Sequence, residues 1–174
     1  TEIPVLTFAG GYSVFNAAGD GIDSNGNIVI SGGTVIVYGP TDNGNGPIDS
    51  GDGNYSVTVS GGTLLAVGSS GMAESAENAG QAVLAASWRN GGISAGETIG
   101  IVDSDGKVTP HHNHVTEGTG ETVAGSVQVS AQAGIKDVMV EGQSVTGASP
   151  TNPINIATAN GTLLVTGYDP VKGE

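Results

Sequence analysis

The chain of 174 residues carries 17 Asp or Glu and only 4 Lys or Arg, a formal net charge of −13, which excludes the basic surface that nucleic-acid binding needs. Hydrophobic residues make up 37% and aromatic residues 4%, while Gly occupies 31 positions, so a core must be built from small aliphatic strand formers between many tight turns. The absence of cysteine excludes disulfides and thiolate sites. No stretch reaches the roughly 18 apolar residues that would predict a membrane span.

The chain opens at Thr1 within a strand-like pattern and shows no signal peptide. We therefore expect a processed or trimmed product. Its acidity fits either a soluble extracellular surface or bound divalent cations that relieve self-repulsion.

Three copies of a Gly-Gly motif predict a repeat architecture. Their second glycines, Gly11, Gly33 and Gly62, are 22 and 29 residues apart. The later copies read NIVISGGTVIVYG and SVTVSGGTLLAVG, each an alternating strand, a glycine corner and a second strand. Such a period is typical of a solenoid, in which stacked repeats bury one another's apolar side chains. We expect four residues of the second repeat to lie over four of the third: Ile28 over Val57, Ile30 over Val59, Val35 over Leu64 and Val37 over Ala66.

Acidic loops at 17–27 and 41–54 follow the first two repeats. Loops at one corner of a solenoid would stack, and their carboxylates would repel one another unless a cation lay among them. Ca²⁺ prefers such oxygen ligands, although the spacing is not that of an EF-hand. The alternative is that Asp, Asn and Gly only form turns here. The first loop brings together Asp20, Asp23, Asn25 and Asn27 as candidate metal ligands, and the second offers Asp42, Asn43, Asn45, Asp49 and Asp52.

The second half of the chain predicts further strands. Residues 70–87 predict one short helix or a cap, with a strand at 82–86, and residues 109–121 predict an exposed loop or linker. The cluster at 111–114 (HHNH) contains the imidazoles that transition metals prefer, with a solvated loop as the competing interpretation. Strands are predicted at 123–130, 137–140, 143–145, 154–158 and 162–168, with hairpin turns at Glu141-Gly142 and Asn160-Gly161.

A family resemblance is carried by the run FAGGYSVFNAAGDGIDSNGNIVISGGTVIVYGPTDNGNGPIDSGDG, followed by VSGGTLLAVGSSGMAES. It resembles the calcium-dependent carbohydrate-binding β-helix family, secreted bacterial proteins similar in fold to pectate-type polysaccharide lyases. The resemblance covers roughly residues 8–108 and implies calcium ligands at Asp20, Asp23, Asp49 and Asp52 and affinity for cell-wall or acidic polysaccharides. An insertion near Ser50-Gly51 shifts Asp52 from the expected register.

These observations predict an all-β fold with three parts. A right-handed parallel β-helix occupies 1–109, an exposed loop or linker 110–122, and a small β-strand module or β-helix cap 123–174. Residues 3–9 (IPVLTFA) resemble the strand expected after the IVDSDGKV segment, so we expect self-association through the N-terminal strand by β-strand addition.

The predicted function is that of a secreted or cell-surface, calcium-binding and carbohydrate-binding protein without catalytic activity. Lyase chemistry needs a base beside the calcium-bound sugar, and Arg89, Lys107, Lys136 and Lys172 all lie outside the acidic loops. Trp88, and more weakly Tyr38, are candidates for stacking on sugar rings, with a core position as the alternative. The alternative function is a structural subunit of an extracellular filament or surface assembly.

Overall fold

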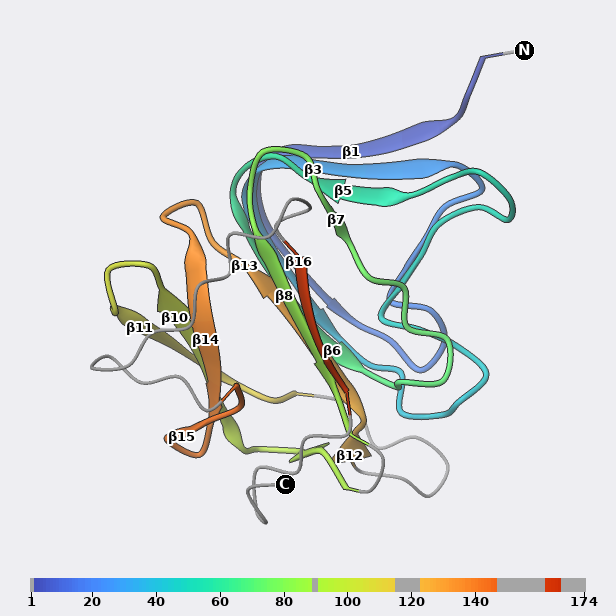
Figure 1. Ribbon diagram of the computed structural model, residues 1–174. Helices are drawn as coiled ribbons and strands as arrows, with labels where there is room; N and C mark the ends of the chain where they lie inside the picture. The colour runs from blue at the N-terminus through green and yellow to red at the C-terminus, as the bar shows by residue number, and fades with distance from the viewer. Residues whose placement is uncertain (1, 89–90, 115–122, 147–161, 167–174) are drawn as a thin grey trace.

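The protein is built from β-strands and connecting turns (Figure 1). The computed structural model describes residues 2–88, 91–114, 123–146 and 162–166. These ranges contain no helix, and so none that is long and apolar enough to cross a membrane. The all-β prediction is confirmed, whereas the short helix within 70–87 is wrong: that segment forms β7 (Glu77–Asn78) and β8 (Val83–Ser87), the second of which was predicted as a strand.

The three Gly-Gly repeats lie side by side in parallel register. They form β1 (Val5–Asn16), β3 (Asn27–Tyr38) and the pair β5 (Val57–Val59) and β6 (Thr63–Gly68). The predicted register is confirmed at all four positions: Ile28 pairs with Val57, Ile30 with Val59, Val35 with Leu64 and Val37 with Ala66.

Backbone conformation favours glycine at the corner of every repeat, and close packing also requires it in the second and third repeats. Gly11, Gly33 and Gly62 have φ angles of 82°, 77° and 82°, a region that other residues rarely adopt. A Cβ on Gly33 would also lie 2.6 Å from the carbonyl oxygen of Gly11, and one on Gly62 would lie 2.5 Å from that of Gly33. The missing side chain therefore lets consecutive repeats approach backbone to backbone.

A strand from the second half of the chain interrupts the parallel stack. β13 (Ser126–Ser130) pairs in antiparallel register with β6 on one side and β8 on the other. Beyond β8 lies β16 (Thr162–Thr166), which is parallel to it. The large sheet is therefore mixed, in the order β16-β8-β13-β6-β3-β5-β7, with β1 also paired to β3.

Polar side chains on β13 satisfy backbone groups near this insertion. Gln128 accepts a hydrogen bond from the N–H of Ala76 (2.9 Å) and donates one to the carbonyl oxygen of Glu74 (2.8 Å). The Ser130 hydroxyl donates to the carbonyl oxygen of Ala82 (2.6 Å). These are buried groups, which need partners when they leave water.

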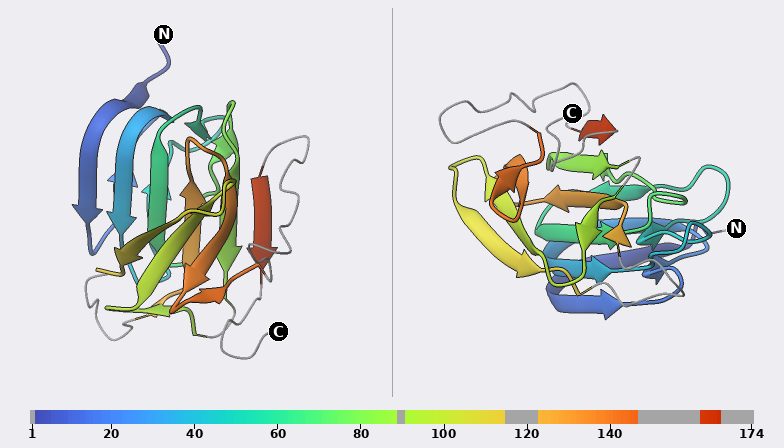
Figure 2. Two further views of the ribbon diagram at one scale, coloured as in Figure 1. Left: turned by 90° about the vertical axis from the view of Figure 1, so that its left-hand side faces the viewer. Right: turned by 90° about the horizontal axis from the view of Figure 1, so that it is seen from below.

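A second sheet packs against the first. It contains β11 (Val108–His112), β10 (Thr98–Asp103), β14 (Ile135–Val140) and β15 (Gln143–Ser144) in antiparallel order. β9 (Ile93–Ser94) and β12 (Val123–Ala124) form a separate two-stranded antiparallel sheet; in the sequence, β9 precedes β10 and β12 follows β11. Figure 2 shows the four strands crossing one face of the large sheet.

The central strands of the large sheet, such as β3 and β6, are buried on both faces. Val35 and Leu64 belong to a core enclosed by the repeats, whereas Ile36 and Leu65 point the other way, into the core between the two sheets. This double burial explains the continuous apolar runs VIVY and LLAV after the glycine corners.

Two further predictions differ from the structure in detail. β11 occupies residues for which an exposed loop or linker was predicted; the strand is exposed as expected, and Pro110 is tolerated because β11 is an edge strand. The strand predicted at 123–130 is divided at Gly125 into β12 and β13. Glu141 and Gly142 both have positive φ, confirming the hairpin turn, and the strand predicted at 154–158 lies outside the described residues.

Candidate metal centre

Two of the candidate carboxylates occupy equivalent positions in neighbouring repeats. β2 (Ile22–Asp23) pairs in parallel with β4 (Ile48–Asp49), which places Asp23 opposite Asp49. Ile22 and Ile48 point into the core, so alternation along a strand directs both carboxylates outward. Since paired strands lie about 4.8 Å apart, the two negative charges are close neighbours on the outer surface.

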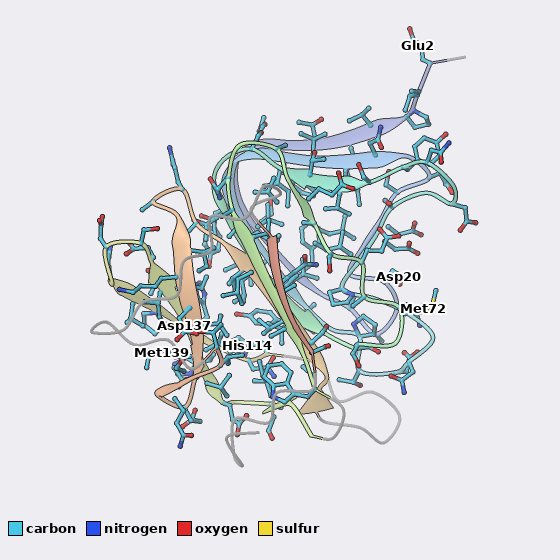
Figure 3. The ribbon with its side chains drawn as sticks, viewed as in Figure 1. Glu2, Asp20, Met72, His114, Asp137 and Met139 are labelled. Atoms are coloured by element: carbon cyan, nitrogen blue, oxygen red, sulfur yellow. The ribbon has the colours of Figure 1, made fainter. Side chains whose placement is uncertain are left out.

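Carboxylates at this corner also bond between repeats. Asp20 accepts a hydrogen bond at Oδ1 from the N–H of Gly46 (2.8 Å), and Glu74 accepts one at Oε2 from the N–H of Ser50 (2.9 Å). Asp42 behaves differently, because it accepts from a backbone N–H only two residues ahead. The turn interpretation therefore holds for Asp42, whereas Asp20 and Glu74 connect one repeat to another. Figure 3 shows Asp20 on the side of the molecule away from the four-stranded sheet.

Asp49 lies at the electrostatic centre of this group. Its partial burial raises the pKa of its carboxyl, and the charges of Asp20, Glu74, Asp23 and Asp52 raise it further, in that order. A carboxyl whose ionised form is disfavoured by four others identifies a local excess of negative charge. We name Asp20, Asp23, Asp49 and Glu74 the acidic corner.

The acidic corner contains most of the predicted ligands and one that was missed. Asp52 is within electrostatic range of Asp49 but is exposed, in the turn after β4. Asn25 is exposed in the turn after β2. Glu74 was not predicted, although it occupies the third repeat's corner in the segment GMAES. Aligning that corner with the first two would have identified it.

The donor set of the acidic corner suits a hard cation. It offers only oxygen, and Ca²⁺ combines carboxylates with amide and backbone carbonyl oxygens and water in flexible geometry. Among the described residues, no group of three or more His, Cys, Asp or Glu side chains is arranged to hold a metal ion. A complete shell would thus need oxygens other than carboxylates.

The two candidate sugar-stacking residues are buried, which corrects that prediction. Tyr38 is 4% exposed and Trp88 is 5% exposed, and both belong to the core between the sheets. The ring of His114 packs edge-on against Tyr38, with centroids 5.4 Å apart. Neither aromatic face is therefore available to a sugar in this structure.

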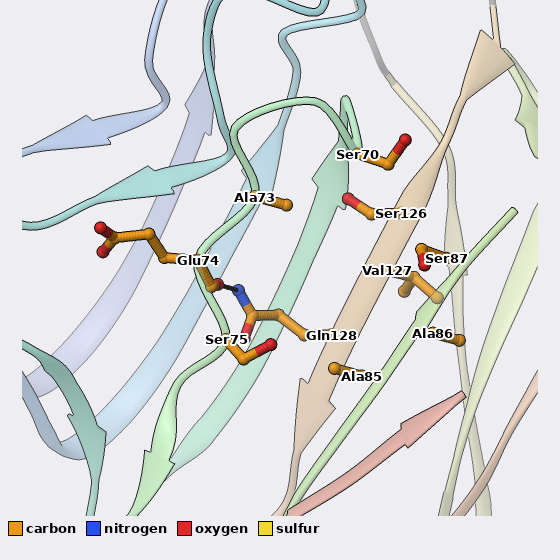
Figure 4. A pocket seen from close by; sticks show the side chains of 10 residues that line it. All are labelled: Ser70, Ala73, Glu74, Ser75, Ala85, Ala86, Ser87, Ser126, Val127 and Gln128. Atoms are coloured by element: carbon orange, nitrogen blue, oxygen red, sulfur yellow. Dashed lines mark hydrogen bonds between the residues drawn. The ribbon is translucent and has the colours of Figure 1, made fainter. Parts of the chain in front are cut away.

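A cavity of about 210 Å³ lies beside the acidic corner, between residues 70–75 and strands β8 and β13 (Figure 4). Its walls are mainly small, with Ser70, Ser126 and Ala85 among them. The side chain of Glu74 points away from the labelled wall residues, while its carbonyl oxygen bonds Gln128. The cavity is smaller than the roughly 300–1,000 Å³ of most ligand pockets.

The histidines and the described bases lie elsewhere. Burial lowers the pKa of His111, and His112 points to the opposite side of β11, since neighbouring strand residues alternate. The rings of His112 and His114 are 6.5 Å apart. Lys136 lies on β14 and Lys107 just before β11, both on the second sheet; Arg89 and Lys172 are outside the described residues.

Comparison with known proteins identifies no relative. No protein family, curated protein or solved structure matches this chain. The acidic corner has to be interpreted from its own geometry.

Proposed function

We propose that residues 5–78 form coils of a right-handed parallel β-helix and that the protein is a secreted, non-catalytic, calcium-binding and carbohydrate-binding protein. The parallel register of three repeats and their shared glycine corners support the β-helix. The calcium-binding part is carried by one observation, the meeting of carboxylates from three repeats at one corner. Asp23 lies opposite Asp49 there, and Asp20 and Glu74 each accept a hydrogen bond from a neighbouring repeat.

Calcium would act first as a stabiliser of the stacked coils. Asp23 and Asp49 are held together by the pairing of β2 and β4, so the fold cannot separate them to reduce their repulsion. A divalent cation bound by the facing carboxylates of Asp23 and Asp49 would neutralise this excess charge. Amide, backbone carbonyl and water oxygens would complete its shell, with Asn25 or Asp52 at the margin and Asp20 and Glu74 adding negative charge nearby. The cation supplies positive charge and oxygen coordination, and the chain supplies a fixed array of carboxylates.

Carbohydrate would then bind at the outer face of the same corner. The net charge of −13 disfavours acidic polysaccharides unless a cation bridges the two, and the acidic corner points outward, where such a bridge can form. The choice of an acidic polysaccharide rests on the family resemblance and on this charge argument. In the sequence all four Lys and Arg residues lie outside the acidic loops, and this favours a binding role over lyase chemistry.

Thermal unfolding with excess calcium or chelator tests the calcium site. A cation at a hundred times its dissociation constant stabilises the fold by about 2.7 kcal/mol, so calcium is expected to raise the unfolding temperature clearly. Asp49→Asn should abolish most of that increase. Asp42→Asn is the matched control, because Asp42 is also an acidic loop residue but bonds only within its own turn. An equal response of both variants would refute the proposed site.

Polysaccharide pull-down tests the carbohydrate part separately. Polygalacturonate should be retained with calcium and released by chelator, whereas Asp49→Asn should retain little in either condition. Binding that survives chelator unchanged would contradict calcium bridging while leaving the structural role of the cation intact.

A further inference from the structure

Exposed apolar side chains concentrate at the N-terminal edge of the large sheet. Of seven large hydrophobic side chains exposed among the described residues, five lie between positions 3 and 14. They are Ile3, Val5, Leu6, Tyr12 and Val14, of which Tyr12 is 70% and Val14 52% exposed. Residues 3–16 contain no charged side chain, in a chain with 17 acidic residues. Long edge strands are normally protected by charge or distortion, and β1 has no such charge.

The glycine corner of β1 has no backbone packed against it on its outer side, whereas the corners of the later repeats each contact the preceding repeat. A Cβ on Gly33 would collide with the backbone of Gly10 and Gly11, and one on Gly62 would collide with the second repeat in the same way. Gly11 has the same φ as Gly62, yet a Cβ on Gly10 or Gly11 would meet nothing within 4 Å. The first repeat thus offers the same backbone surface that the other repeats use for stacking.

The opposite edge of the same sheet matches β1 in strand direction. β1, β3 and β6 are mutually parallel, and β8 runs the same way because antiparallel β13 lies between it and β6. β16 is parallel to β8 and therefore also to β1. Figure 2 (left) shows β1 and β16 at opposite edges of the sheet.

One row of aligned residues connects the two edges. Successive register partners across the sheet are Val14, Ile36, Leu65, Val129, Leu84 and Leu163. Every member is aliphatic. Within the described ranges, β1 pairs only with β3, and β16 only with β8.

We propose that β1 of one molecule pairs in parallel with β16 of a second copy, with Val14 opposite Leu163, and so continues the large sheet from copy to copy. The occupant is a second copy because this chain presents, at its other edge, an uncharged strand of the required direction and register. The contact joins two different surfaces, so it repeats head to tail and builds a filament unless the ring closes. It does not depend on the calcium proposal.

The ladder geometry identifies a substitution that blocks only the outer edge. The N–H of Ala17 bonds the carbonyl oxygen of Tyr38, and groups on a parallel strand alternate between its two sides. The N–H of Val14 therefore faces the free edge of β1, and Val14→Pro removes a donor that β3 does not use. Val14→Lys is a second disruption, which adds charge without changing the backbone.

Light scattering after gel filtration, with electron microscopy of the same samples, measures assembly. The unmodified protein is expected to form concentration-dependent oligomers or filaments, and Val14→Pro and Val14→Lys are expected to be monomeric with unchanged circular dichroism. Met72→Lys is the control, because Met72 is equally exposed (57%) but lies in the loop before β7. A wild-type protein that stays monomeric at high concentration, or variants that assemble like Met72→Lys, would overturn the proposal.

Disulfide trapping distinguishes this arrangement from other self-contacts. The chain has no cysteine, so Val14→Cys with Leu163→Cys introduces the only pair. Opposed strand positions are close enough for a disulfide, and oxidation should give a ladder of covalent multimers. Either single variant should give little product. Efficient dimerisation of Val14→Cys alone would show that two β1 strands meet and would refute the pairing with β16.

Discussion

Replacing a corner glycine by alanine measures how closely the repeats must approach. Gly33 and Gly11 form a matched pair, since both have φ near +80° but only Gly33 has backbone atoms where a Cβ would lie. Gly33→Ala therefore combines backbone strain with a collision, whereas Gly11→Ala introduces strain alone.

The magnitudes follow from these two terms. Holding a non-glycine residue in the left-handed region costs about 1–2 kcal/mol. The lower entropy of the unfolded chain with alanine offsets about 0.4–1 kcal/mol of that cost. The collision adds about 1–3 kcal/mol, typical of overpacking, because the contacts of 2.5 and 2.6 Å involve backbone atoms of the first repeat that cannot rotate away. We expect Gly11→Ala to lose about 1 kcal/mol of unfolding free energy and Gly33→Ala about 3 kcal/mol.

Urea unfolding of both variants, at a concentration where the protein is monomeric, gives the two losses directly. Equal losses would refute the inference that close backbone contact between repeats sets the glycine requirement.

Three other predictions concern buried or crowded polar groups. Because the pKa of Asp49 is raised in the folded state, its protonation favours folding: this contribution is present below the ordinary value of 3.8 and is lost as pH rises through the folded-state value. Without calcium, Asp49→Asn should therefore be more stable than the wild type at neutral pH, and this difference should become smaller in acid. Denaturant unfolding at several pH values measures it, and a difference that does not change with pH would contradict the reasoning. Gln128→Ala leaves the N–H of Ala76 unpaired and should cost about 1–3 kcal/mol in the same assay, and a loss under 0.5 kcal/mol would contradict a role in joining β13 to residues 74–76. Asp137 is buried and accepts hydrogen bonds from the hydroxyls of Ser144 and Thr146. In the Asp137→Ala variant, the amides of the β14–β15 hairpin should therefore be the first to lose protection from hydrogen exchange. A uniform loss of protection across both sheets would contradict this local role.

The repeat register was predictable because two local signals agree. The Gly-Gly pair marks the same backbone corner in each repeat, and alternation on either side decides which aliphatic residues point inward. A slip of one residue would expose Ile28 and Ile30 together, so the pattern admits one register. The outward direction of Asp23 and Asp49 follows from the same alternation, each directly after a buried Ile.

The insertion of β13 was not predictable from local pattern. Its partners β6 and β8 lie about 40 to 60 residues earlier in the chain, and nothing in SVQVS indicates which strands it joins. Its composition is explained by the structure, since Ser126, Gln128 and Ser130 meet backbone groups while Val127 and Val129 enter the core between the sheets. Trp88 was misjudged for a related reason, because the sheet that covers it comes mostly from later in the sequence.

The acidic corner is charged and the β1 edge is not, so the two proposals can be tested separately. The acidic corner lies within each molecule, so removing calcium should lower the stability of every copy. The β1 edge carries no charge, so its pairing should behave as an apolar contact that weakens on cooling. We therefore expect assembled protein to dissociate partly in the cold and to remain associated in chelator, provided that the temperature stays below unfolding. Dissociation by chelator at constant circular dichroism would instead place a cation within the junction, and the uncharged pairing of β1 with β16 would then be wrong.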